Sequence, residues 1–428
     1  MQIERLYQIF LNHPHIQTDT RKLAPGELFF CLKGPNFDAN SFAQQAIEMG
    51  AAAVIVDEET GVKNDKIIQV DDSLIALQAL ARHHRLQFQI PFIAITGSNG
   101  KTTTKELTHA VLSSTYKTYT TVGNLNNHIG IPLTILKIKK DAEMAIIEMG
   151  ANHQKEIEGY CEIALPTHGL INNCGKAHLE GFGGEEGVRK GKGELFVFLE
   201  KNNGTGFINS DLDYLVDMSK NIKNKIFYGN SQGQFITTTL STDPCLTLRI
   251  SNSQWGSQKI KTQLVGAYNT PNVEAAICIG NEFRISLDNI KSAIEAFVPD
   301  NARSQLLIRG NNKIILDAYN ANPSSMEVAI ENLVAQDAEH KILCLGAMME
   351  LGEYSLVEHQ KLVDKLMEKG LADVILVGGD FKNIKHPFHF FEDSDKASEW
   401  LRKNEVHHSL ILIKGSRSTQ MEKLVTAF

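Results

Sequence analysis

The stretch Thr96-Gly97-Ser98-Asn99-Gly100-Lys101-Thr102-Thr103-Thr104 decides both the fold and the chemistry of this chain. An apolar run, 92–95, precedes it and a helix-like run, 105–112, follows it, so the order is strand, glycine-rich loop, helix. Glycines let backbone N–H groups turn toward an anion, and a helix N-terminus adds partial positive charge. The order predicts a phosphate-binding loop, in which Lys101 reaches the outer phosphates and Thr102 ligates Mg²⁺.

The loop departs from the general pattern in the position of its first glycine. In G-x-x-x-x-G-K-[ST] that glycine would fall at Ile95, whereas here it stands at Gly97. The loop is therefore shortened and belongs to a particular subgroup. Seven residues are expected to contact the nucleotide: Gly97, Ser98, Asn99, Gly100, Lys101, Thr102 and Thr103.

Composition limits the class of protein. A length of 428 residues favours about three domains, and 42% hydrophobic with 22% charged residues is ordinary for a globular protein. A net charge of −7 provides no basic field for nucleic acid. The six cysteines lie far apart, the N-terminus lacks a secretory signal, and no apolar run approaches the ~20 residues of a membrane span. We expect a cytoplasmic protein with reduced thiols and no nucleic-acid partner.

The chain is expected to form three α/β domains, over residues 1–87, 88–298 and 299–428. The first alternates strands at 28–32 and 52–56 with a helix at 42–49, and a boundary falls at 87–91. In the second, apolar strands run into Glu148 and into Asn172. The polar, turn-rich stretch from Asn202 to Trp255 predicts β-structure added to that domain.

The C-terminal domain has the clearest alternation. Strands are expected at 314–316, 342–345, 374–377 and 410–413, and helices at 324–335, 356–369 and 395–403. Such alternation predicts a parallel, doubly wound, Rossmann-like sheet that binds ligands at the carboxyl ends of its strands. Those ends carry Asp317, Asn320, Gly346 and Lys414.

Several polar residues could carry chemistry, and each also has an ordinary structural explanation. Glu148 ends a buried strand, where an acidic residue commonly reaches Mg²⁺. His178 stands in a loop, where a histidine is more often structural than a ligand. Lys192 lies in a basic run that indicates a solvated helix start, and Asn269 and Asn272 could cap a helix. In the first domain, the turns at 18–21 and 33–38 could hold an anion or be ordinary surface turns.

Taken together, these segments resemble the Mur ligases, the ATP-dependent amide-bond-forming enzymes of peptidoglycan precursor synthesis. The shortened loop, Glu148-Met149-Gly150, the segment from Asn173 to His178 and the helix start from Asn269 to Asn272 carry the resemblance. It spans nearly the whole chain and implies three domains in order: a small UDP-substrate domain, a central P-loop-type ATPase domain with a mainly parallel sheet, and a Rossmann-like ligase domain.

The resemblance implies roles that the residues alone leave open. His178 matches a ligand of a second Mg²⁺. Lys192 matches a lysine that CO₂ converts to a carbamate, an anionic oxygen ligand that a plain amine cannot provide. Lys190 competes for that role, because the basic run allows a misplacement by two residues. Further nucleotide contacts are implied for Asn269, Asn272, Arg303 and Asp317, and UDP contacts for Asp19, Thr20, Arg21 and Lys33.

Four further stretches narrow the resemblance to the branch that adds D-alanyl-D-alanine to UDP-N-acetylmuramoyl-tripeptide. They are 123–127, 318–326, 351–353 with His359, and 414–417. The substrate contacts that they imply are Asn124, Asn126, Asn127, Tyr319, Asn320, Asn322, Lys414, Ser416 and Arg417.

Five positions depart from the pattern of the family. Ala302 replaces a common glycine, Thr20 a serine, Ala39-Asn40 a Gly-His pair, and Ala347 an aspartate. The contacts to UDP and the affinity for the acceptor are expected to differ accordingly.

The implied reaction transfers the γ-phosphoryl group of ATP to the tripeptide carboxylate, after which the dipeptide amine attacks the acyl phosphate. Lys101 and two Mg²⁺ ions would spread the charge, with Thr102 and Glu148 holding the first ion, and His178 and carbamylated Lys192 the second. The alternatives are a related ligase with another acceptor, such as a folylpolyglutamate-type enzyme, and a nucleotide-dependent switch or binding protein. The third residue of the tripeptide, lysine or diaminopimelate, stays open, and a monomer is expected.

Overall fold

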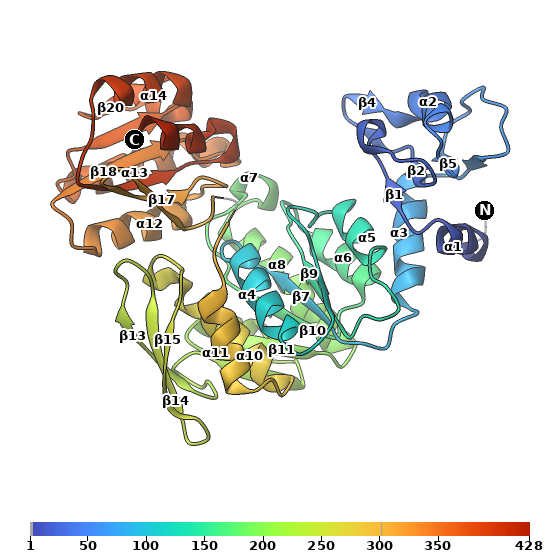
Figure 1. Ribbon diagram of the computed structural model, residues 1–428, viewed down its shortest axis with the longest axis horizontal. Coiled ribbons are helices and arrows are strands. Elements are labelled where there is room, and N and C mark those ends of the chain that lie inside the picture. Colours follow the sequence, from blue (N-terminus) through green and yellow to red (C-terminus); the bar gives the residue numbers. More distant parts are fainter. Residues whose placement is uncertain (1–2, 301) are drawn as a thin grey trace.

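The computed structural model describes residues 3–300 and 302–428, which form three α/β units in chain order (Figure 1). The N-terminal and C-terminal units lie on opposite sides of the central unit. Met1 and Gln2, part of the stretch that argues against a signal sequence, lie outside the described residues. Within the described residues no helix is long and apolar enough to cross a membrane, and the six cysteines are free thiols.

The N-terminal unit is built on a parallel sheet with the strand order β1-β2-β5-β6. Its strands are β1 Ile16–Gln17, β2 Leu28–Phe30, β5 Ala53–Val56 and β6 Ile67–Gln69, with a hairpin of β3 Lys33–Gly34 and β4 Phe37–Asp38. Its helices are α1 Ile3–Asn12, α2 Ala43–Glu48 and α3 Ser73–Arg85, with 3₁₀ turns η1 Thr20–Lys22 and η2 Ala39–Phe42. The expected strands and helix of this unit are confirmed.

The central unit contains a parallel sheet with the order β12-β11-β10-β7-β9-β8. Its strands are β7 Phe92–Thr96, β8 Thr118–Thr120, β9 Met144–Glu148, β10 His168–Ile171, β11 Thr205–Asn209 and β12 Asn224–Tyr228. Its helices are α4 Lys101–Ser113, α5 Gly130–Ile135, α6 Glu156–Ala164, α7 Leu179–Phe182, α8 Glu185–Lys201, α9 Asp213–Met218, α10 Thr270–Glu282 and α11 Leu287–Ala296, with η3 Ala267–Asn269.

Both faces of this sheet are buried, as the apolar sequence of β7 requires. Side chains alternate across a strand. Ile93 and Ile95 therefore belong to the apolar cluster that includes residues of α4 and α10, whereas Phe92 and Ala94 belong to the cluster that includes residues of α8. The strand is held between helical layers, and its carboxyl end is fixed where the phosphate loop begins.

The expectation of added β-structure between Asn202 and Trp255 is only partly right. β11 and β12 extend the central parallel sheet, and only β13 Ile236–Ser241, β14 Thr247–Asn252 and β15 Gly256–Lys261 form a separate antiparallel sheet. The apolar runs of β11 and β12 are short and bounded by polar turns, so local composition conceals that β11 lies inside the parallel sheet and β12 at its edge.

The C-terminal unit has a six-stranded sheet with the order β16-β17-β21-β18-β19-β20. Its strands are β16 Gln305–Arg309, β17 Asn312–Asp317, β18 His340–Gly346, β19 Val374–Val377, β20 His389–Phe391 and β21 Ser409–Lys414. Its helices are α12 Pro323–Ala335, α13 Ser355–Glu368 and α14 Ser394–Lys403, with η4 Gly352–Tyr354, η5 Gly379–Asn383, η6 Arg417–Thr419 and η7 Met421–Ala427.

The four strands expected in this unit are confirmed, and they are parallel. The two edge strands are additions. β16 pairs antiparallel with β17, and β20 extends the other edge. Neither contains a fully buried residue, although each has a short apolar run.

Helix α3 fastens the N-terminal unit to the central unit. Leu77 and Leu80 on this helix share an apolar cluster with residues of α5 and α6. Arg85, at the end of the helix, donates from Nε to the carbonyl oxygen of Ala164 at 2.8 Å and from Nη2 to that of Leu165 at 2.9 Å. Its guanidinium also lies 3.7 Å from the centroid of the Phe92 ring. The carbonyls at the end of α6 thus receive a buried cation from another unit.

We expect Arg85→Met to lower the free energy of unfolding by about 3 kcal/mol. The substitution leaves buried carbonyl oxygens without the charge-assisted hydrogen bonds that they accept in the wild type. Arg82→Met is the matched control, since Arg82 lies one turn earlier on the same helix and donates from Nε to the Glu162 carbonyl at an exposed site. Its expected cost is below about 1 kcal/mol. Urea unfolding followed by circular dichroism measures both, and equal losses would contradict the interpretation.

Candidate active site between the central and C-terminal units

A cleft of about 860 Å³ lies between the central and C-terminal units. The carboxyl ends of β7, β9 and β10 meet it on one side, and those of β17 and β21 on the other. Parallel sheets bind ligands at these ends. Most of the residues expected to bind nucleotide, metal or acceptor therefore line one cavity.

The phosphate loop is a sharp turn between β7 and α4. Helix α4 begins at Lys101, four residues earlier than the sequence pattern predicts. Gly97 and Gly100 adopt φ values of +147° and +81°, which glycine tolerates without strain. The loop is bonded to Asn173, whose carbonyl oxygen accepts from Ser98 N at 2.9 Å and whose Oδ1 accepts from Asn99 N at 3.0 Å.

The carboxamide of Asn272 anchors this turn. Its Oδ1 accepts from Thr104 Oγ1 at 3.0 Å and from Asn172 Nδ2 at 3.2 Å, and its Nδ2 donates to Asn269 Oδ1 at 2.8 Å. A Cβ on Gly100 would lie 2.5 Å from Asn272 Oδ1. Neither asparagine caps a helix through its side chain, so that simpler explanation is wrong. Both line the cleft and connect α10 to the loop.

Lys101 folds back over its own loop. Its Nζ donates to the carbonyl oxygens of Gly97 at 2.7 Å and Ser98 at 3.3 Å. Burial lowers the pKa of Lys101, and the nearby Glu148 carboxylate partly offsets that effect. The ammonium group is thus held beside backbone groups that can turn toward phosphate oxygens.

Glu148 has one carboxylate oxygen without a partner. Its side chain is buried, Oε1 accepts from Asn126 Nδ2 at 2.7 Å, and the backbone N donates to Thr121 Oγ1 at 3.0 Å. Oε2 is buried and has no hydrogen-bond partner within the described part of the chain. An unpaired carboxylate oxygen is costly to bury, and a bound cation would remove that cost.

His178 lies at the start of α7, with a φ of +53°. Its Nδ1 is 2.6 Å from Oε2 of Glu350, a residue of the C-terminal unit. The ring lines the cleft, so the structure brings it to the same cavity as Lys101, Thr102 and Glu148.

Lys192 occupies the middle of α8 and is 1% exposed, so the interpretation as a solvated helix start is wrong. Its Nζ donates to the Ala151 carbonyl at 3.0 Å. Burial, with a smaller effect from the charge of Lys101, lowers the pKa of Lys192 to about 7. Lys190 instead carries a 65% exposed side chain that pairs with Glu186 at 2.8 Å. Of the two lysines, only Lys192 has a buried side chain.

The donor set fits Mg²⁺ held jointly by protein and nucleotide. Among the described residues, no group of three His, Cys, Asp or Glu side chains gathers closely enough to hold a metal ion. Mg²⁺ commonly takes one or two carboxylates together with substrate phosphates and water. The unpaired oxygen of Glu148, beside a phosphate loop, matches that requirement.

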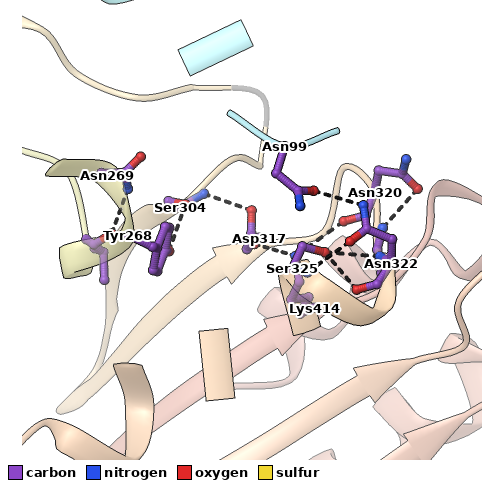
Figure 2. Close-up of polar contacts among 11 residues, drawn as sticks. Asn99, Tyr268, Asn269, Ser304, Asp317, Asn320, Asn322, Ser325 and Lys414 are labelled. Carbon is purple, nitrogen blue, oxygen red and sulfur yellow. Dashed lines mark hydrogen bonds and ion pairs between the residues drawn. The ribbon is translucent and has the colours of Figure 1, made fainter. Parts of the chain in front are cut away.

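The C-terminal side of the cleft is organised around Asp317, at the end of β17 (Figure 2). Its Oδ2 pairs with the Lys414 Nζ at 2.5 Å, and its Oδ1 accepts from Ser304 N at 3.2 Å. The Ser304 hydroxyl lies 2.9 Å from that of Tyr268. Lys414, expected to contact substrate, is 1% exposed and holds Asp317.

Hydrogen bonds join the C-terminal unit to the loop side of the cleft. Asn322 Nδ2 donates to Asn99 Oδ1 at 2.8 Å, as Figure 2 shows, and Lys176 N donates to Ser324 Oγ at 2.9 Å. Asn322 also caps α12, where Ser325 N donates to its Oδ1 at 2.9 Å. The first turn of α12 is thereby docked on the phosphate loop.

Other residues singled out by the sequence are distributed as follows. The cleft also receives Thr103, Asn124, Asn126, Asn127, Arg303, Tyr319 and Asn320. Ser416, whose Oγ donates to the Ala347 carbonyl, and Arg417, paired with Glu422, are not among the residues that line it. In the N-terminal unit, Asp19 pairs with Arg21 beside Thr20, and Lys33 pairs with Asp57 and Glu58. Within the described residues, that unit contributes no lining residue to this cleft.

The sequence reasoning missed Glu350, Tyr268, Ser304 and Ser324 as site residues. Ser324 lies inside the stretch 318–326, and Glu350 immediately precedes the stretch 351–353. Proximity to these two stretches was the available signal for these residues. The unusual Ala302 has a φ of +54°, a conformation in which the more common glycine would be unstrained.

Comparisons with known proteins agree with this geometry. The models of the Mur ligase family catalytic domain, the Mur ligase middle domain and the Mur ligase glutamate ligase domain match residues 14–85, 95–280 and 302–417. UDP-N-acetylmuramoyl-tripeptide–D-alanyl-D-alanine ligase of Escherichia coli strain K12 is 35% identical over 422 residues, which cover 96% of this chain and 93% of the relative.

Solved structures extend the likeness to three dimensions. MurF from Acinetobacter baumannii superposes with a TM-score of 0.89 at 29% identity, covering 99% of this chain and 98% of that one. MurF ligase from Thermotoga maritima in complex with ADP gives a TM-score of 0.88 at 26% identity, covering 98% and 97%.

Gly100→Ala should disrupt the loop, because a methyl group would displace the Asn272 oxygen in addition to straining the left-handed backbone. Gly123→Ala is the control: its φ is +59°, and among the described residues other than Gly123 and its two chain neighbours, no atom lies within 4 Å of the position that a Cβ would take there. We expect Gly100→Ala to cost about 1–2 kcal/mol more in unfolding free energy than the control. It should also weaken the binding of a fluorescent ATP analogue at least about tenfold. Equal effects of the two variants would show that the Asn272 contact does not constrain the loop.

Proposed function

The chain belongs to the Mur ligase family, and we propose that it joins D-alanyl-D-alanine to UDP-N-acetylmuramoyl-tripeptide with ATP, giving the UDP-linked pentapeptide precursor of peptidoglycan. The observation that carries this proposal is the match of a relative named for this reaction over 96% of the chain. The match includes the unit that is expected to bind the acceptor. ATP and a UDP-linked substrate favour the cytoplasm as the site of the reaction.

A carboxylate needs activation before it can form an amide, because its oxygen is a poor leaving group. The tripeptide carboxylate oxygen attacks the γ-phosphorus of ATP, a P–O bond forms, and the bond to ADP breaks. The dipeptide amine then attacks the acyl carbon, a C–N bond forms, the C–O bond breaks, and phosphate leaves as the amine loses a proton. Lys101, beside the loop N–H groups, stabilises negative charge on the transferred phosphoryl group.

The metal-binding role falls to four side chains. Thr102 and Glu148 would hold one Mg²⁺, and His178 with the carbamate of Lys192 would hold another; bound Mg²⁺ supplies charge neutralisation for phosphoryl transfer. The lowered pKa of Lys192 supports the carbamate, because only the neutral amine reacts with CO₂. Its buried position supports Lys192 over Lys190.

The contacts of α12 with the phosphate loop support a role in bringing the reactants together. With the acceptor on the C-terminal unit and ATP on the central unit, the hydrogen bond between Asn322 and Asn99 fixes the distance between the two binding surfaces. Docked surfaces hold the amine close to the acyl group and exclude water that would hydrolyse it.

The reaction itself is tested with purified protein, ATP, Mg²⁺, UDP-N-acetylmuramoyl-tripeptide ending in lysine or in diaminopimelate, and D-alanyl-D-alanine. We expect phosphate release only when both peptide substrates are present, and a product mass that equals the sum of the two minus one water. Glycylglycine and free glutamate serve as acceptor controls. Rapid ATP hydrolysis without peptide substrates, or faster turnover with glutamate, would contradict the proposal.

The carbamate is tested by ¹³C NMR of the protein under ¹³CO₂. Because the pKa of Lys192 is lowered to about 7, the amine is mostly protonated at pH 6 and mostly neutral at pH 8, so the carbamate signal should rise across that interval. Lys192→Met should remove the signal and the ligase activity without unfolding the protein. Lys190→Met should preserve both; loss of the signal in that variant instead would reassign the modified lysine.

A further inference from the structure

His359, which the resemblance singled out, does not line the cleft, and its contacts show what it holds. The imidazole is fully buried, its Nε2 accepts from Met348 N at 3.0 Å, and its Nδ1 lies 2.7 Å from the Ser355 carbonyl oxygen. These bonds fix the backbone between β18 and η4. Leu351, 1% exposed, anchors the other end of the same segment. The segment carries one carboxylate, Glu350, toward the central unit.

Glu350 faces His178 across the boundary between the units, with its Oε2 2.6 Å from Nδ1 of the ring. Both residues have left-handed backbones, with φ values of +61° and +53°. Such conformations cost of order 1–3 kcal/mol each and persist where the surroundings over-determine them, most often at functional sites. Nδ1 is buried and makes no hydrogen bond of regular geometry to the described residues, so the carboxylate is the charged group at this nitrogen.

We propose that Glu350 is a positioning residue for His178: its carboxylate holds the proton on Nδ1 and leaves Nε2 as the nitrogen with a free lone pair. The proposal rests on the metal-binding role given to His178 above. Histidines that bind metals almost always donate their other ring N–H to a carboxylate or carbonyl, which fixes the tautomer and the ring orientation.

Glu350 belongs to the C-terminal unit and His178 to the central unit, so their contact depends on how the two units dock. The segment around His178 is also where that unit docks, through the bond between Lys176 and Ser324 and through the packing of α7 against η4. The ring therefore acquires its partner only when the acceptor-binding unit is in place.

The test compares the wild type with Glu350→Gln, which keeps the shape of the side chain and removes its charge. Glu353→Gln is the matched control, because Glu353 lies three residues further along the same segment and is exposed. Ring ¹⁵N chemical shifts of ¹⁵N-histidine-labelled protein report the His178 tautomer, with the resonance assigned by its loss in His178→Gln. The spectra are recorded without ATP or peptides, so a failure of the ligase assay leaves this result unaffected.

We expect the wild type and Glu353→Gln to show the tautomer protonated at Nδ1, and Glu350→Gln to show a mixture of tautomers. Titration with Mn²⁺ and a non-hydrolysable ATP analogue, followed by electron paramagnetic resonance, should show metal affinity weakened about 10–100-fold only in Glu350→Gln. An unchanged His178 tautomer in Glu350→Gln would overturn the proposal. So would weakened Mn²⁺ binding with a wild-type tautomer, which would make Glu350 a direct ligand, and so would equal effects in Glu353→Gln.

Discussion

The carboxamide of Asn272 is the constraint on which the site depends. It ties α10 to Thr104 of α4 and to Asn172 at the end of β10, and its oxygen occupies the space that a side chain at position 100 would need. The loop is therefore shaped by a buried polar network before any phosphate arrives. Preorganised N–H groups lose little freedom on binding, which is the condition under which such donors stabilise transferred charge best.

The three units are joined in two different ways. Helix α3 packs along α5 and α6, and its buried Arg85 bonds carbonyls of the central unit, so the N-terminal unit is fixed by apolar area and by charge. The C-terminal unit meets the central one through polar pairs on the phosphate loop and on the segment from Asn173 to His178, and through the packing of α7 against η4. The two boundaries differ in where their polar groups lie: Arg85 is buried at the first, whereas Asn99, Asn322 and His178 of the second line the cleft.

Much of this could be predicted from the sequence, because short-range patterns determine it. The run from Thr96 to Thr104 located the loop, and the inner strands of the C-terminal sheet followed from their apolar alternation with helices. The edge strand β16 was not predicted, although it contains Leu306, Leu307 and Ile308, because it forms an antiparallel pair with β17 and lies outside the alternation of strands and helices. The burial of Lys192 was also not predicted, because a basic run gives no sign that one of its lysines is enclosed by distant helices and strands. The pairing of Glu350 with His178 could not be predicted, because the two residues lie in different units.

The role of α3 also bears on how relatives of this chain can exchange parts. By chain connectivity the first unit ends near residue 87, yet Leu77 and Leu80 complete an apolar cluster whose other members include Ile131, Ile135 and Tyr160. A recombination point at residue 87 would pair one parent's helix with the other parent's binding surface and leave mismatched volumes in a dense interior. A crossover near residue 300 separates no helix from the surface on which it packs, because α11 ends at Ala296 and β16 begins at Gln305. In this architecture the C-terminal unit is therefore the one that relatives can exchange, and the first two units are inherited together.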